Sequence, residues 1–420
     1  MKTNSKKWLK RLGIFLGTLI LIVVGYVVYV FSSYYRLEDK QKLTITGKST
    51  EKAKTKKSYR ITSGNIGFGA YSDDYSFFMD GGKESRARSK DAVIENVSSY
   101  AEAVAQLNPD FMLFQEVDID GTRSYHVDER KLLLSQTLST DNTSRNHTFA
   151  QNYDSPYLFY PILEPHGKNK SGMLTVSNMK ITESIRRSLP IEDGFMKLLD
   201  LDRCYSVNRI PTENGKELVL YNLHLSAYTS DPSTADNQLR MLFEDMKEEY
   251  DAGNYIVAGG DFNKDLLGNS AEIFGHKELE DNWAKPISEE LIPDFMQLIA
   301  PFDEKNPVPS CRNADQPYSE SDFVVTVDGF LVSDNVTVED ALVLDTGLYG
   351  FYFRVKKVQA DVLQRTPACI SIHNVFLHTH PSHLRSFSNT SPPLPRSLHR
   401  SLHLRMRKSP AWWSLHLHLS

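Results

Sequence analysis

The sequence predicts a layered α/β domain that follows one transmembrane helix and precedes an irregular tail. Two apolar runs of strand length each end in polar residues: residues 218–221 lead into Asn222-Leu223-His224-Leu225, and residues 255–258 lead into Gly259-Gly260-Asp261-Phe262-Asn263. A third observation is a strand, helix, strand arrangement over residues 59–114 that ends beside Glu116. Because open α/β sheets expose their chemistry at the carboxyl ends of strands, the pattern that predicts the fold also predicts the position of the site.

Charge divides the 420 residues into three regions. Residues 1–57 hold 13 Lys and Arg against 3 Asp and Glu, residues 58–347 hold 25 against 49, and residues 348–420 hold 10 against 1. The middle region thus carries a formal charge near −24 (25 minus 49), which disfavours indiscriminate nucleic-acid binding unless a metal ion or a local basic patch supplies attraction. The three cysteines form no CxxC pair, so neither a disulfide framework nor a thiolate metal site is expected.

The N-terminal segment predicts a membrane anchor. Residues 12–31 contain no charged residue, and this length spans a bilayer core of about 30 Å. Basic residues precede the run and residues of both signs follow it, so the positive-inside rule makes residues 1–35 a cytoplasmic N-terminus with a single-pass anchor and places the remainder outside the cell membrane. A cleaved signal peptide is the alternative. The length of the run and the poor cleavage site at Phe31-Ser32-Ser33 favour a retained anchor.

The domain is predicted over residues 58–347, after a solvated basic stalk at residues 36–57 that is rich in Lys and Thr. Residues 86–107 carry apolar side chains at spacings of 4, 3, 4 and 3, which predicts a helix with one buried face. Further strands are predicted at residues 111–114, 173–176 and 203–210, and two or three between residues 322 and 344.

Three loop segments have both a structural and a functional interpretation. Gly167–Gly172 suits a hairpin loop better than a phosphate-binding loop, and the aromatic residues 77–79 suit the core better than a lipid contact. Arg312 and Asn313 lie in a loop flanked by proline, where they either contact substrate or, as the simpler interpretation, belong to the surface.

Six polar residues stand at or beside the short apolar runs. A carboxylate such as Glu116 is the hard oxygen ligand that suits Mg²⁺, an ion that keeps waters for a phosphate to displace. An Asp and an Asn together can take a proton from water and hold that water in line, while a His donates to a phosphate oxygen. The set therefore suits attack on a phosphoester, although each residue taken singly also suits a turn, a cap or a surface ion pair. In order, the residues are Asn65, Glu116, His224, Asp261, Asn263 and Asp328.

Five ordered motifs resemble the endonuclease/exonuclease/phosphatase superfamily, the DNase I-like group that includes inositol polyphosphate 5-phosphatases and neutral sphingomyelinases. The resemblance covers residues 58 to about 347. It implies a four-layer α/β sandwich that hydrolyses a phosphodiester or phosphomonoester with Mg²⁺, or with Mn²⁺ in its place. The motifs are Ser63-Gly64-Asn65-Ile66-Gly67, Gln115-Glu116-Val117-Asp118, Asn222-Leu223-His224-Leu225, Gly260-Asp261-Phe262-Asn263 and Val327-Asp328-Gly329-Phe330.

The resemblance also implies a role for each of the six residues. Glu116 would ligate the metal, with support from Asn65. His224 would contact the scissile phosphate, Asp261 would polarise the attacking water, Asn263 would orient groups around the phosphate, and Asp328 would orient a final His. The implied substrate is a phosphoester, either a lipid head group, a nucleotide or nucleic acid, and no protein partner is evident.

The final motif of the family is missing from this chain. Members end with a strand bearing Ser-Asp-His, whereas residues 343–347 here lead into Leu348-Tyr349-Gly350-Phe351-Tyr352, and the nearest approximation, at His373, lacks the Asp. Residues 348–420 are a low-complexity His/Arg-rich tail with eight of the thirteen His, which favours out-of-frame or foreign sequence joined near Gly347 over a metal-binding appendage.

We therefore expect a domain that lacks its last strand, leaving an unpaired sheet edge, and an enzyme impaired by the loss of one catalytic group. Two alternatives remain open at this point. The chain is either a non-catalytic surface or binding protein that retains the fold, or a non-functional frameshifted product.

Overall fold

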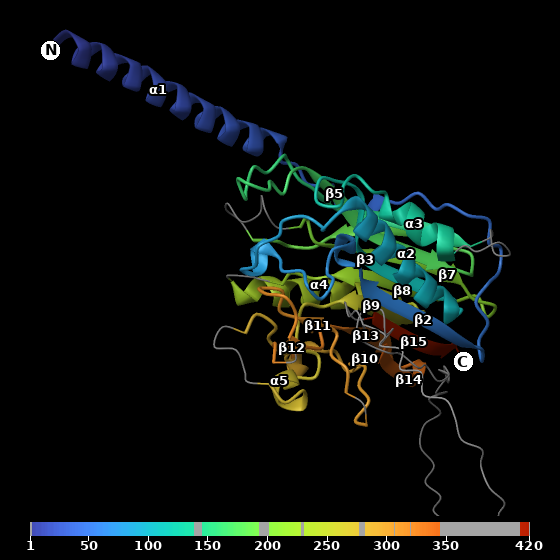
Figure 1. The fold of residues 1–420 in the computed structure, drawn as a ribbon. Helices are drawn as coiled ribbons and strands as arrows, with labels where there is room; N and C mark the ends of the chain where they lie inside the picture. Colours follow the sequence, from blue (N-terminus) through green and yellow to red (C-terminus); the bar gives the residue numbers. More distant parts are fainter. Residues whose placement is uncertain are drawn as a thin grey trace, which may run out of the picture. The chain divides into compact units, whose positions relative to one another are not determined.

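Alternating apolar residues build two β-sheets whose facing surfaces form the core (Figure 1). The computed structural model describes residues 2–137, 145–192, 201–227, 231–276, 282–305, 307–319, 321–344 and 412–419. The seven-stranded sheet has the order β1 (Gln41–Lys42), β6 (Glu183–Ser188), β7 (Cys204–Pro211), β8 (Glu217–His224), β9 (Tyr255–Asp261), β13 (Asp328–Ser333) and β10 (Met296–Ile299). The six-stranded sheet has the order β14 (Val336–Leu344), β15 (Trp412–Leu419), β2 (Ser58–Asn65), β3 (Phe111–Gly121), β5 (Asn169–Ser177) and β4 (Asn146–Asp154). A small separate sheet pairs β11 (Cys311–Arg312) with β12 (Val324–Val325).

Strand β8 shows how the layers form. Its Leu218 and Leu220 belong to the core cluster that also contains Phe111 and Leu113 of the other sheet. The intervening Val219 and Tyr221 instead join a second cluster with apolar residues of helix α4 (Pro232–Asp251). Because successive side chains of a strand point to opposite faces, one strand contributes to both the core between the sheets and the core beneath the helix.

The helices cover the outer faces of the two sheets and complete the four layers that the resemblance implied. Helix α2 begins after Ser89, whose side chain accepts a hydrogen bond from the Ala92 N–H, and it buries the predicted face against the six-stranded sheet, where the Tyr100 and Phe114 rings lie 5.7 Å apart. The predicted four-layer α/β sandwich is thus confirmed. The helices are α1 (Lys2–Ser33), α2 (Lys90–Gln106), α3 (Glu129–Thr137), α4 (Pro232–Asp251) and α5 (Ser270–Ile273), and the 3-10 turns are Gly67–Gly69, Phe78–Asp80 and Glu289–Leu291.

Helix α1 contains the predicted apolar run. Residues 6–33 are long and apolar enough to cross a membrane by length and composition, a test that a signal sequence also passes. Most of its large apolar side chains are exposed.

Residues 36–57 do not form the predicted solvated stalk. Strand β1 pairs with β6, Thr46 bridges His147, and Ala53 is fully buried where it bridges Thr212. The Arg36 guanidinium lies 3.2 Å from the Asp202 carboxylate. The segment attaches through short stretches of backbone pairing and through single side chains such as Arg36. Neither kind of contact leaves a periodic pattern, which is why the sequence indicated a solvated stalk.

The six-stranded sheet also differs from the expected incomplete one. Strand β15, from the tail, lies between β14 and β2 and is antiparallel to both, with Trp413 opposite Ser63 and His418 opposite Ser58. The expectation of an unpaired edge on β2 is therefore wrong. Residues 345–411, which include His373 and most of the predicted low-complexity tail, lie outside the described residues.

Candidate active site

The six predicted residues come from neighbouring strand ends. Asn65 ends β2, Glu116 lies in β3, His224 ends β8, and Asp261 ends β9, with Asn263 two residues beyond. Asp328 begins β13 directly opposite Asp261, and His224 is opposite Asp261 on the other side. The topology therefore brings residues that are up to 263 positions apart (328 minus 65) to one end of the two sheets.

Asn65 joins the two sheets at this end. Its amide nitrogen donates to Glu116 Oε1 at 3.1 Å and to Asp261 Oδ2 at 3.0 Å, while its oxygen accepts the Gly67 N–H at 2.9 Å. The amide nitrogen, rather than the oxygen, thus faces the carboxylates.

Backbone irregularities set the directions of two site residues. Glu116 has a φ of +51° and lies where the register between β3 and β5 shifts, so it belongs to a β-bulge. Among the carboxylates of β3 in the described structure, only that of Glu116 contacts Asn65. Asn263 has a φ of +50°, a conformation that Asn adopts more readily than most residues, and its side chain donates to the Leu225 carbonyl at 2.8 Å.

His224 lies between the two carboxylates. Its Nε2 is 3.9 Å from Glu116 Oε1 and 3.7 Å from Asp261 Oδ2. Burial, with the charges of Arg203 and Arg123 in the same direction, holds the pKa of His224 well below its ordinary value. The imidazole is therefore neutral and carries a single N–H, and its buried Nδ1 has no hydrogen-bond partner within the described part of the chain.

The two aspartates of the site are held as weak acids. Burial raises the pKa of Asp261 to about 6, and the nearby Glu116 charge adds to this, against the hydrogen bonds from Asn65 and from the Asn263 N–H at 2.8 Å. Burial likewise raises the pKa of Asp328 well above its ordinary value, with Asp261 adding to the effect. Within the described ranges, Asp328 Oδ1 is buried without a hydrogen-bond partner.

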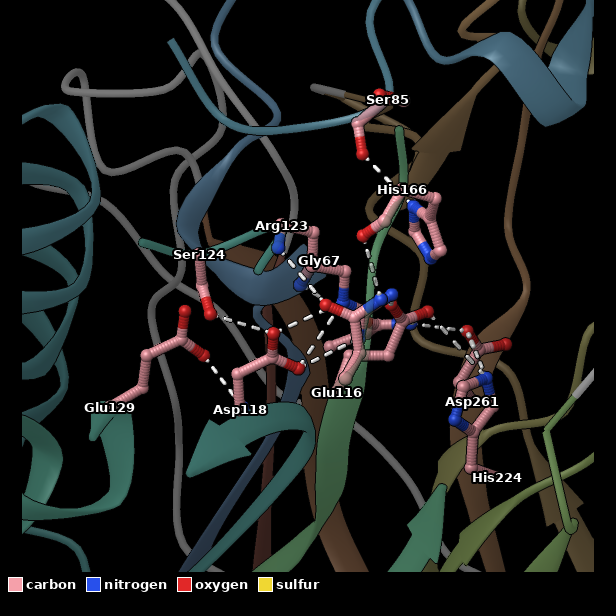
Figure 2. A network of polar contacts seen from close by, with 12 residues as sticks. Gly67, Ser85, Glu116, Asp118, Arg123, Ser124, Glu129, His166, His224 and Asp261 are labelled. Carbon is pink, nitrogen blue, oxygen red and sulfur yellow. Dashed lines mark hydrogen bonds and ion pairs between the residues drawn. The ribbon is translucent and has the colours of Figure 1, made fainter. Parts of the chain in front are cut away.

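Sequence reasoning missed Arg123, which lies beside these residues (Figure 2). Its guanidinium donates to Asp118 through Nε at 3.1 Å and Nη2 at 2.8 Å, and Nη1 is 4.0 Å from Glu116 Oε2. It also stacks over the Phe68 ring at 4.0 Å. A signal existed, because two acids on one strand, Glu116 and Asp118, are followed closely by an arginine that could neutralise them.

Arg312 and Asn313 have structural partners. The Arg312 guanidinium donates to the Tyr75 carbonyl at 2.9 Å and to the Gln316 carbonyl at 3.1 Å, and Asn313 accepts the Trp283 indole N–H at 2.9 Å. These contacts tie loops together, in agreement with the simpler of the two interpretations.

The fit of a metal depends on the two carboxylates. Across the described ranges no group of three or more His, Cys, Asp or Glu gathers to hold a metal ion. Mg²⁺ needs fewer protein ligands, because it binds through one or two carboxylates and keeps several waters. Glu116 and Asp261 each place an oxygen within 3.1 Å of one Asn65 nitrogen, and Glu116 is partly exposed. This donor set fits Mg²⁺ or Mn²⁺ and disfavours a softer metal.

Residues 64–349 match the model of the Endonuclease/Exonuclease/phosphatase family, which is more than half of the chain. The chain belongs to this family. Endonuclease/exonuclease/phosphatase proteins hydrolyse phosphoesters, generally with divalent metal ions.

Solved structures of the endonuclease/exonuclease/phosphatase type are similar to this chain at low identity. A Beutenbergia cavernae DSM 12333 protein of this family has 13% identity and a TM-score of 0.47, covering 87% of this chain and 72% of its own. ANGEL2, a 2',3'-cyclic phosphatase, has 14% identity and a TM-score of 0.44, covering 71% and 88%. Truncated Caenorhabditis elegans TDP2 has 11% identity and a TM-score of 0.42, covering 86% and 97%. No curated protein matches the chain.

Proposed function

We propose that this chain is a Mg²⁺-dependent phosphoester hydrolase, with Mn²⁺ as the alternative ion, displayed on the outer face of the cell membrane and impaired by loss of the family's final catalytic His. The observation that carries the proposal is the convergence around Asn65, which bonds to both Glu116 and Asp261 while His224 lies within 4 Å of both acids. A turn residue or a surface ion pair has no reason to join two sheets in this way.

Each residue has chemistry that suits its place. Asp261 takes a proton from the attacking water, because a carboxylate with a pKa of about 6 is largely ionised at neutral pH and is a stronger base than an ordinary Asp. The Asn65 amide and the Asn263 N–H fix the orientation of that carboxylate. Neutral His224 donates its one N–H to a phosphate oxygen. A metal ion held by Glu116 would stabilise the negative charge of the phosphate.

The impairment is proposed from the tail strand. In the family, the Asp corresponding to Asp328 orients a final His, and here Asp328 Oδ1 is buried without a partner in the described part of the chain. The register of β15 places His416 opposite Arg60 and His418 opposite Ser58. Arg60 is five residues from Asn65, or ~17 Å along a strand. Strand β15 therefore pairs as the last strand of the family would, but it has no histidine opposite the end of β2 that carries Asn65.

Membrane display is proposed from helix α1. Its apolar run spans a bilayer by length, and the basic residues before it place the N-terminus in the cytoplasm and the domain outside. The substrate is proposed to be a phosphoester reached from that side, either a lipid head group, a nucleotide or nucleic acid.

The test uses a repaired chain, in which the residues after Gly347 are replaced by a short strand that begins with Ser-Asp-His. We expect this chain to hydrolyse bis(p-nitrophenyl) phosphate or p-nitrophenyl phosphate with Mg²⁺ and not with EDTA. Glu116→Gln and Asp261→Asn should each lower the rate by roughly 10²–10⁴. Glu213→Gln, at an exposed turn between β7 and β8, serves as the matched control and should leave the rate unchanged.

The outcomes separate the alternatives. Turnover that survives both Glu116→Gln and Asp261→Asn contradicts the site assignment. A folded repaired chain without turnover in Mg²⁺ or Mn²⁺ supports the non-catalytic alternative, a surface protein that retains the fold for binding. Sequencing the coding DNA across codons 340–360 tests the origin of the tail, because an alternative frame that encodes Ser-Asp-His identifies a frameshifted product, and a frame without it contradicts that origin.

A further inference from the structure

An apolar loop tip stands out from the domain between β4 and β5. Residues 157–163, with the sequence Tyr-Leu-Phe-Tyr-Pro-Ile-Leu, contain no charged side chain. Ile162 is 84% exposed and Leu163 is 100% exposed, and Phe159 and Tyr160 are more than half exposed. A contiguous exposed patch of this kind marks an interaction surface in a soluble domain.

The base of this loop is firmly held. Leu158 and Gly167 exchange two backbone hydrogen bonds of 3.0 Å. The Ser85 N–H donates to Glu164 Oε2 at 2.9 Å, and Arg86 Nε donates to the Pro165 carbonyl at 2.7 Å. The apolar tip is therefore held in solvent by a fixed base, and the cost of exposing it points to a partner that covers it.

The loop also contacts the apolar helix α1. The Tyr26 hydroxyl donates to the Tyr157 carbonyl at 3.2 Å and accepts the Phe159 N–H at 3.1 Å, while the Tyr29 hydroxyl accepts the Tyr157 N–H at 3.1 Å. The Tyr26 and Phe159 rings meet edge to face at 5.2 Å. Both helix tyrosines belong to the charge-free run of residues 12–31.

This contact fixes the depth of the loop relative to a bilayer. Tyr26 lies five residues before Phe31, the end of the apolar run, or ~7.5 Å along the helix axis. If the run spans the bilayer, a loop bonded to Tyr26 and Tyr29 lies just inside the boundary between head groups and acyl chains. Tyrosines and exposed aliphatic side chains are the residues that suit that boundary.

We propose that residues 157–163 insert into the outer leaflet beside α1, as a second membrane contact of the domain. The inference rests on the membrane anchor in the proposed function. The occupant of the apolar tip is the lipid bilayer, because the tip is continuous with the helix that would span it and carries no charge that would select a protein partner.

The second contact ties the candidate site to the membrane surface. The loop leads into Asn169, whose side-chain oxygen accepts the Arg123 backbone N–H at 2.9 Å. His166, in the same loop, places its Nδ1 3.0 Å from the Ser85 carbonyl oxygen, near Arg123 (Figure 2). A chain attached only through α1 can turn about its anchor, whereas one attached at two points holds the site at a constant height above the head groups.

The test places a tryptophan at the tip of the full chain in phosphatidylcholine vesicles. Leu163→Trp is compared with Glu213→Trp, which lies in the turn between β7 and β8 at the other end of the strands, and the emission of the four native tryptophans is subtracted. We expect the added emission of Trp at position 163 to shift to the blue and to fall with brominated lipid but not with iodide. The control should respond to iodide only. Adding Ile162→Asp should restore the iodide response at position 163.

Fluorescence separates failure of this inference from failure of the proposed function, because it needs no turnover. If the chain resists carbonate extraction while position 163 responds to iodide and not to brominated lipid, the anchor stands and the inserted loop is wrong. If carbonate releases the chain from the vesicles, α1 is not a membrane anchor, and the insertion of residues 157–163 is contradicted as well.

Discussion

The two sheets contribute to the candidate site in different ways. In the seven-stranded sheet, β8, β9 and β13 place His224, Asp261 and Asp328 side by side in register. In the six-stranded sheet, β2 and β3 supply Asn65 and Glu116, but the strand beside β2 is β15 (Trp412–Leu419), which contains no Ser-Asp-His. A strand position in a sheet accepts many sequences because backbone groups make the pairing, whereas a catalytic position accepts very few. The fold can therefore persist where the chemistry does not.

The largest expected effect is the loss of stability when Gly260, in the seven-stranded sheet, is replaced. Gly260 has a φ of +152°, and a Cβ there would collide with the Leu223 carbonyl of the neighbouring strand. Gly260→Ala should therefore lower the free energy of unfolding by roughly 3–5 kcal/mol, measured by urea denaturation. Gly215→Ala is the control, since Gly215 also has a positive φ of +84° but open space around it, and its cost should be only about 1–2 kcal/mol. Equal costs would show that the strand contact at Gly260 is not tight.

The next largest effect is expected in the six-stranded sheet, when strand β15 is deleted. Removing residues 412–419 takes the pairing partner from both β2 and β14. Each backbone hydrogen bond stabilises the fold by about 0.5–1.5 kcal/mol, but each ordered residue of the strand costs about 1–2 kcal/mol in conformational entropy, which the deletion releases. Because the two effects largely offset each other, the free energy of unfolding should fall by only roughly 2–4 kcal/mol. Replacing the same eight residues with alternating Thr and Val should restore most of this loss, because the pairing needs a strand and not these side chains. Deletion without effect on urea denaturation would contradict the position of β15.

A smaller effect is expected at Asp261, whose burial makes the free energy of unfolding depend on pH. Its pKa rises from 3.8 to about 6 on folding, so the buried anion costs nothing below pH 3.8 and its full cost is reached above pH 6. In EDTA, Asp261→Asn should therefore gain unfolding free energy relative to the unmodified chain as pH rises from 4 to 7, by on the order of 1–3 kcal/mol. A difference between the two chains that stays constant over this range would contradict a raised pKa.

The sequence predicted the parts of this molecule that depend on local pattern. The apolar runs before His224 and Asp261 and the helical spacing of α2 each lie within one element, and all became the predicted elements. Six residues at strand ends were also predicted to form one site, and the topology brings them to one end of the sheets.

The remainder depends on pairing between distant segments. The hydrogen bond of Asn65 to Asp261 joins residues 196 positions apart, and no local pattern reveals that the amide nitrogen faces the acid. Strands β1 and β15 pair through backbone groups, which every residue except proline carries in full. The bulge that turns Glu116 inward is likewise a property of the register with β5.

The most direct test of the account compares the unmodified chain with the repaired chain in Mg²⁺-dependent hydrolysis of bis(p-nitrophenyl) phosphate. Both chains carry Asn65, Glu116, His224 and Asp261, and they differ only after Gly347. We predict that the repaired chain is faster by roughly 10²–10⁴, the usual contribution of one positioned catalytic group. Equal rates in the two chains would contradict the account, because the residues from 348 onward would then supply the missing group or the reaction would proceed without it.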